Sequence, residues 1–111
     1  MAELTDLEIT RLCAKAMGLL DEGVAPTGNG RTIWVRPDGN AQHYMYNPLG
    51  DDAQCFALVK RFEMRLQEPE GAHDPRWRVT MWNPRIVSQD KDLNRAICEC
   101  VAKMEQAKAS V

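Results

Sequence analysis

The chain has 111 residues, of which 44% are hydrophobic and 27% are charged, and its formal net charge is −2. This length suits one domain that buries about two thirds of its unfolded surface without a metal or disulfide to stabilise it. The charge lacks the Lys/Arg excess of a general nucleic-acid binder, and no apolar run approaches the roughly 20 residues of a membrane span. We therefore expect a single domain over residues 1–111, with frayed ends at 1–4 and 106–111.

The cellular compartment is indicated by the N-terminus and by the cysteines. The first ten residues, MAELTDLEIT, have neither the basic nor the apolar region of a signal peptide. The four cysteines, Cys13, Cys55, Cys98 and Cys100, form no CxxC pair. In a reducing compartment such residues behave as small buried apolar side chains. These features predict a cytoplasmic protein.

The first predicted element is a helix from Asp6 to about Met17. In LTDLEI, Thr5 can accept from the third helical amide while Glu8 reaches back to Thr5, which is the pattern of a capping box. Apolar residues then recur at helical spacing. Gly18 offers a stop, because glycine adopts the left-handed conformation without steric cost.

A loop and a β-hairpin are predicted next. Residues 19–31 hold three glycines and one proline, which is typical of a loop. Two β-rich runs then flank a Pro-Asp-Gly turn, so strands are predicted at Thr32–Arg36 and Ala41–Tyr46. Pro48 ends the second strand, because proline cannot donate to a strand ladder.

A second helix is predicted after Asp51, which can cap it, with Gln54 at the third helical position completing another capping box. Carboxylates at a helix start also interact favourably with the helix dipole. Helix capping accounts for the Asp51-Asp52 pair, although paired carboxylates could also serve acid–base or metal chemistry. The buried face is expected to consist of Cys55, Phe56, Val59 and Phe62.

Two strands and a third helix complete the prediction. Near Phe62 the apolar pattern changes to alternation, which predicts a third strand close behind the second helix. A polar loop follows, and RWRVTMW alternates again as a fourth strand. After NPRIVSQ the last helix is predicted to begin at Asp90 or Lys91. Its apolar stripe consists of Leu93, Ala96, Ile97, Cys100, Val101 and Met104.

The predicted order is therefore α-β-β-α-β-β-α. This order suits an α+β domain in which the helices pack on one four-stranded, mainly antiparallel sheet. The strands also carry aromatic residues and arginines, which would lie together if they share one sheet face: Trp34, Tyr44, Tyr46, Arg65, Arg78 and Trp82. Such a face can anchor a protein partner or stack on bases, or it can be covered by a helix or a second copy of the chain. The partner-binding residues that we predict are Trp34, Tyr44, Tyr46, Arg78 and Trp82.

Catalytic, metal and cofactor chemistry finds little support. Cys98 and Cys100 lie about 200° apart around a helix, so they cannot share one metal-binding face. His43 could approach Cys55 as a base beside a nucleophile, but we favour the interpretation that it is a partly buried structural histidine of the sheet. The glycine-rich TGNGR precedes a strand and lacks the lysine of a phosphate loop. We expect no catalytic residue, no metal and no cofactor.

Four segments, DLEITRLCAKAMG, YNPLGDDAQCFALVKRF, WRVTMW and DLNRAICECVAKM, resemble the phage α-β-α (ABA) sandwich domain family, from about Asp6 to Met104. Its members are small proteins of tailed bacteriophages and prophages. The resemblance implies helices on both faces of the sheet, and it brings no catalytic motif. It also implies a phage accessory protein in the bacterial cytoplasm.

The resemblance favours a non-enzymatic protein that binds and inhibits a host protein, for example as an anti-CRISPR or other anti-defence protein. The alternative is a small-molecule binder that sequesters a nucleotide signal of host defence. An enzyme that degrades such a signal is a third hypothesis. A membrane partner is not expected, and nucleic acid is less favoured as a partner than a protein. The aromatic face or an exposed edge strand would also suit a symmetric homodimer.

Overall fold

The structure is a computed structural model that describes residues 4–26, 30–82 and 84–109. In chain order the elements are α1 (Asp6–Ala16), β1 (Leu19–Val24), β2 (Ile33–Pro37), β3 (Tyr44–Tyr46), α2 (Asp52–Phe62), β4 (Arg65–Gln67), β5 (Trp77–Met81), β6 (Ile86–Asp90) and α3 (Leu93–Ala109). The strands form two three-stranded antiparallel sheets, β1-β2-β3 and β4-β5-β6. The α+β class is confirmed, but the single four-stranded sheet is wrong.

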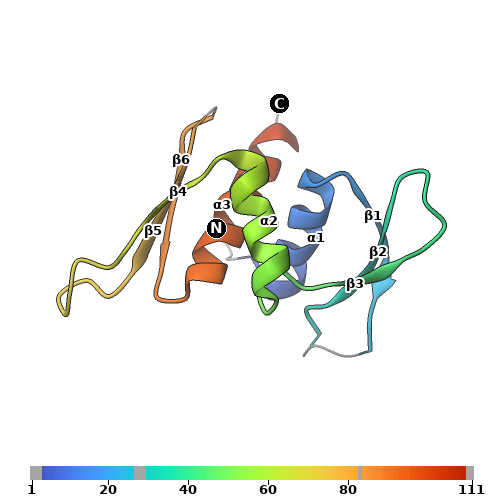
Figure 1. Cartoon of the computed structure of the whole chain (residues 1–111), viewed down its shortest axis with the longest axis horizontal. Helices are drawn as coiled ribbons and strands as arrows, with labels where there is room; N and C mark the ends of the chain where they lie inside the picture. The colour runs from blue at the N-terminus through green and yellow to red at the C-terminus, as the bar shows by residue number, and fades with distance from the viewer. Residues whose placement is uncertain (1–3, 27–29, 83, 110–111) are drawn as a thin grey trace.

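The helices form a layer between the two sheets (Figure 1). Helix α1 packs on β1 and β2, and α3 packs on β5 and β6. The helices also pack on one another, α1 and α2 each against α3. The layer order is therefore sheet, helices, sheet, which is the reverse of the helix-sheet-helix order that the resemblance implies.

Two strands lie where the sequence predicted none, and each is the third strand of one sheet. β1 occupies the predicted loop after Gly18, and β6 occupies the segment before the last helix. β1 is mostly exposed and irregular in register between Asp21 and Val24, so its sequence shows no alternation. Each strand is held by main-chain hydrogen bonds to its neighbour, β2 or β5, and such bonds leave no sequence pattern.

Local capping determines both ends of α1 as predicted. The Thr5 amide donates to Glu8 Oε1 at 2.9 Å, and the Glu8 amide donates to Thr5 Oγ1 at 3.1 Å. Gly18 follows the helix with a φ of +74°, a conformation that glycine adopts without strain. The β2–β3 hairpin is likewise confirmed, with Trp34 opposite Met45.

Helix α2 begins as predicted but buries a different face. Asp51 Oδ1 accepts from the Gln54 amide at 3.0 Å, whereas the Gln54 side chain bonds to Asn47 and Met45 and does not close a capping box. Phe56 is 56% exposed, and Leu58 is fully buried in its place. The prediction that Phe56 is buried is therefore wrong: α2 packs on α3, and the Phe56 side chain stays largely exposed beside that contact.

Helix α3 is the centre of the core. Its predicted stripe is buried, apart from the half-buried Leu93, and further residues on its other sides are buried too: Cys98, Ala102 and Glu105. This follows from its neighbours, because α1, α2, β5 and β6 all pack on it. The helix starts after Asp92, later than predicted, because Asp90 ends β6. It also continues through residues 106–109, which the sequence predicted to fray.

None of the helices within the described part of the chain is long and apolar enough to cross a membrane.

Candidate functional site

The predicted partner-binding residues fall on two different sheets. Trp34 lies on β2, and Tyr44 and Tyr46 lie on β3, all in the first sheet. Arg78 lies on β5 and Trp82 directly follows it, in the second sheet. The helix layer separates the two sheets (Figure 1). The five residues therefore do not form one continuous surface.

The first sheet presents an aromatic face on the side away from the helices. Ile33 and Val35 are fully buried against the core, so Trp34 between them points outward. Met45 lies opposite Trp34 and is 47% exposed, while the His43 ring packs edge-on against Trp34 with centroids 5.2 Å apart. We call Trp34, His43 and Met45 the first-sheet face.

The two tyrosines of β3 have different environments. Tyr46 is only 3% exposed and belongs to the core, so its burial removes it from any contact surface. Desolvation raises the pKa of its phenol, and the hydroxyl has no hydrogen-bond partner within the described residues. Tyr44 is 42% exposed on the edge strand and is accessible to a partner.

The second sheet carries a smaller exposed group. Trp82 is 52% exposed, and the Arg85 guanidinium lies 5.7 Å from its ring centroid, within the range of a cation–π contact. Arg78 is exposed on β5 opposite Gln89 of β6. These residues present a charged, less apolar surface than the first-sheet face.

The four cysteines lie on helices and are buried, as the sequence predicted, and all four are free thiols. Cys13 Sγ donates to the Cys98 carbonyl oxygen at 3.5 Å, joining α1 to α3. Burial raises the pKa of Cys100 to about 11, and the pKa of Cys98 is raised chiefly by its hydrogen bond to Cys13. Thiols in these surroundings stay protonated at neutral pH and are poor nucleophiles.

The proposed His43–Cys55 pairing does not occur. His43 is exposed beside Trp34 on the outer side of the first sheet, whereas Cys55 is buried on α2 in the helix layer. Within residues 4–26, 30–82 and 84–109, no group of three or more His, Cys, Asp or Glu side chains is placed to hold a metal. The TGNGR segment falls mostly outside the described residues, so its phosphate-loop reading is left as a prediction.

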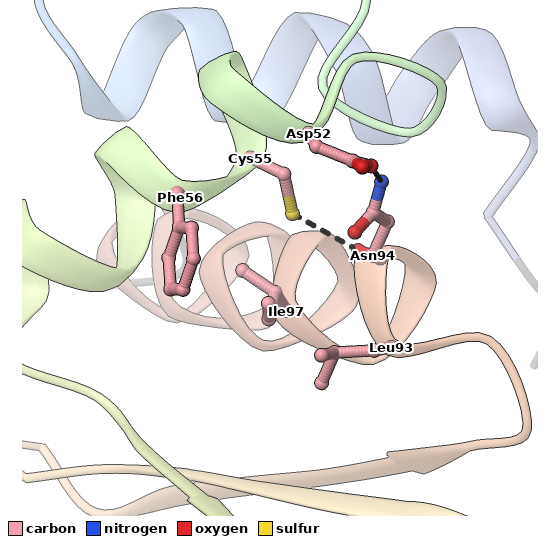
Figure 2. A pocket seen from close by; sticks show the side chains of 6 residues that line it. All are labelled: Asp52, Cys55, Phe56, Leu93, Asn94 and Ile97. Carbon is pink, nitrogen blue, oxygen red and sulfur yellow. Dashed lines mark hydrogen bonds between the residues drawn. The ribbon is translucent and has the colours of Figure 1, made fainter.

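A pocket of about 170 Å³ lies between the N-terminal parts of α2 and α3 (Figure 2). Apolar side chains contribute most of its lining, with an Asp–Asn pair beside them: Asp52, Cys55, Phe56, Leu93, Asn94 and Ile97. Asn94 Nδ2 donates to Asp52 Oδ1 at 2.9 Å, and Cys55 Sγ donates to the Asn94 carbonyl oxygen at 3.7 Å. The sequence did not indicate this pocket, because it depends on how two distant helices pack together.

The described chain is thus an α+β protein in which helices pack on two antiparallel sheets. Comparison with protein family models, with curated proteins and with solved structures finds no match.

Proposed function

We propose that the chain is a non-enzymatic protein that acts by binding another protein through the first-sheet face. The supporting observation is that Trp34, His43 and Met45 lie together on the side of the first sheet away from the buried Ile33 and Val35. Trp and Met are enriched at the centres of protein interfaces, where they fill pockets of the partner. Tyr44 is exposed on the same strand as Met45, but it lies opposite Val35 and points to the other side of the sheet, so it is not part of this surface.

The resemblance to phage ABA sandwich proteins supplies the class of partner. We propose a phage-encoded protein that works in the bacterial cytoplasm and binds a component of host immunity, such as a CRISPR complex. Inhibition by occlusion requires a complementary surface and no catalytic group. The protonated, buried thiols are consistent with such a role.

A nucleotide-sequestering function has weaker support from the pocket. Pockets for drug-sized ligands and cofactors usually enclose about 300–1,000 Å³, whereas this pocket encloses about 170 Å³. The Asp52 carboxylate at the pocket would also repel a phosphate group. The pocket is therefore too small, and of the wrong charge, to enclose a nucleotide.

The test is an affinity capture with two matched double variants. Tagged wild type, Trp34→Ala/Met45→Ala and Arg78→Ala/Trp82→Ala are each used to capture proteins from a defence-competent bacterial lysate, followed by mass spectrometry. We expect wild type and the second-sheet variant to retain one stoichiometric immune-complex subunit. The first-sheet variant should lose it while keeping its melting temperature.

Three results would contradict the proposal. Retention of the partner by a folded Trp34→Ala/Met45→Ala variant would exclude the first-sheet face, and loss in Arg78→Ala/Trp82→Ala alone would place the interface on the second sheet. A wild-type protein that captures no stoichiometric protein would oppose the binding function itself.

A further inference from the structure

We propose that the pocket between α2 and α3 binds a small organic cation that carries one apolar ring, of the benzylammonium type. The ring would occupy the apolar part of the pocket, and the ammonium group would lie at Asp52. This site is separate from the first-sheet face and does not depend on the proposed function.

The size of the pocket sets the size of the ligand. An apolar cavity of about 150 Å³ accommodates a benzene molecule, and the pocket here encloses about 170 Å³. Leu93 and Ile97 of α3 face Cys55 and Phe56 of α2 across it (Figure 2). These side chains offer a ring contact surface without polar groups that would need hydrogen bonds.

Charge complementarity favours a cation. Asp52 Oδ1 accepts from the neutral Asn94 amide, and among the described residues Asp52 has no ion pair with a basic side chain. Asp51 and Asp92, which lie next to the pocket, accept from the Gln54 and Asn94 amides.

These two caps offset the positive ends of α2 and α3, which would otherwise oppose a cation. The carboxylate of Asp52 therefore adds a negative charge at the pocket that is not neutralised by any basic side chain in the described part of the chain. Lys91 beside Asp92 is exposed to solvent.

The surroundings of the Cys55 thiol also favour a positively charged ligand. Its pKa is raised first by a hydrogen bond with Cys98 and by burial, and the negative charges of Asp52 and Asp92 add to the increase. The field of both carboxylates therefore reaches the inner wall of the pocket. A bound cation would experience that field as an attraction.

Phe56 supplies the remaining contact. Its ring is 56% exposed beside the pocket, in a helix position that the apolar pattern would bury. An aromatic face attracts an ammonium group and packs favourably on a second ring. A benzylammonium ligand would use both properties and would cover part of this ring.

The test is a titration followed by amide chemical shifts in two-dimensional NMR at low ionic strength and neutral pH. The probes are benzylamine, benzyl alcohol and phenylacetate, which share one ring and differ in charge. We expect benzylamine to shift the Cys55, Phe56, Asn94 and Ile97 amides saturably. Because Asp52 is exposed and its field is screened, benzyl alcohol should bind about two- to fivefold more weakly. Phenylacetate should bind most weakly of the three.

Substitutions test whether the Asp52 charge and the apolar pocket are responsible for the binding. Asp52→Asn keeps the side-chain shape and should weaken benzylamine binding to the level of benzyl alcohol, whereas Asp38→Asn, a distant exposed control, should not change it. Leu93→Trp at the half-buried rim should fill the pocket and abolish binding. No saturable shift at these amides, equal binding of phenylacetate, or unchanged binding in a folded Leu93→Trp variant would each overturn the proposal.

Discussion

The Asn94 side-chain amide donates to the Asp52 carboxylate at 2.9 Å, linking the first turn of α3 to the first turn of α2 across 42 positions of the chain. Asn94 Nδ2 also lies 3.5 Å from the Leu49 carbonyl oxygen. These bonds hold the start of α2 at the distance that leaves the pocket between the two helices.

A double-mutant cycle measures this link. Asp52→Ala and Asn94→Ala should each lower the free energy of unfolding, and the pair should be coupled by about 0.5–1 kcal/mol, as expected for one exposed hydrogen bond to a charged group. Urea denaturation of the four proteins gives the coupling energy. Strictly additive effects would show that the bond contributes nothing in solution.

Two residues on α2 test which of its faces is buried. Leu58 is fully buried, so Leu58→Ala should cost about 2–5 kcal/mol through lost contacts and a residual cavity. Phe56→Ala should change stability by no more than about 0.5 kcal/mol, because its ring is 56% exposed. Both values come from chemical denaturation. A large loss of stability in Phe56→Ala would contradict the exposure of this ring and support the buried face that the sequence pattern predicted.

The capping box of α1 predicts both a mutational and a pH effect. Thr5→Ala should cost about 1 kcal/mol, while Thr5→Ser should largely retain the cap. Hydrogen bonds from the Thr5 amide and hydroxyl keep the pKa of Glu8 below its ordinary value of 4.5. A carboxyl whose pKa is lower in the folded state stabilises the fold above its unfolded pKa. That stabilisation is lost as the pH falls through the folded pKa.

Stability should therefore decrease as the pH falls below about 4.5, and Thr5→Ala should show a smaller decrease. Thermal unfolding of both proteins between neutral and acidic pH checks this. Because Thr5→Ala keeps the backbone amide, equal pH dependence of the two proteins would mean that the Thr5 hydroxyl does not lower the pKa of Glu8.

The buried thiols predict slow chemical labelling. All four cysteines of the folded chain should react with a thiol-specific disulfide reagent far more slowly than free cysteine, because each is buried. Ala53→Cys, at an exposed position of α2, supplies the control and should add one rapidly reacting thiol. Rapid reaction of a native cysteine without unfolding would contradict its burial.

We also expect the folded protein to be less stable at alkaline pH, because of the buried Cys100 thiol. Burial raises the pKa of Cys100 from its ordinary value of 9.0 to about 11. The unfolded chain then releases this proton first as the pH rises, so the free energy of unfolding should fall above about pH 9. Cys100→Ala should reduce that pH dependence, measured by urea denaturation at neutral and alkaline pH. An unchanged slope would show that another group titrates there.

Short-range features were predictable because they depend on residues within one turn of each other. Thr5 and Glu8 cap α1, Asp51 caps α2, and Gly18 ends the first helix with a left-handed conformation. The apolar stripe of α3 was equally predictable, since a helix that packs on others repeats its buried residues at helical spacing. Most of the helices and strands therefore followed from local physical chemistry.

The strands β1 and β6 and the exposure of Phe56 could not be predicted from local sequence patterns. β1 and β6 are stabilised by main-chain bonds to β2 and β5, so their side chains need not alternate. Phe56 fits the apolar stripe of α2, yet it lies beside the pocket between α2 and α3 and is 56% exposed. Neither outcome is encoded within one turn or one strand of sequence.

The sequence by itself determined the ends of α1, the start of α2, the hairpin, the buried cysteines and the apolar stripe of α3, because each depends on neighbouring residues or on side-chain polarity. Only the tertiary structure decided that Trp34 and Arg78 lie on different sheets, and that Asp52 and Asn94 meet beside a pocket. The physical reason is the burial of α3 on nearly all sides. A helix so buried needs neighbours on both sides, which separates the strands into two sheets and brings distant helix ends together.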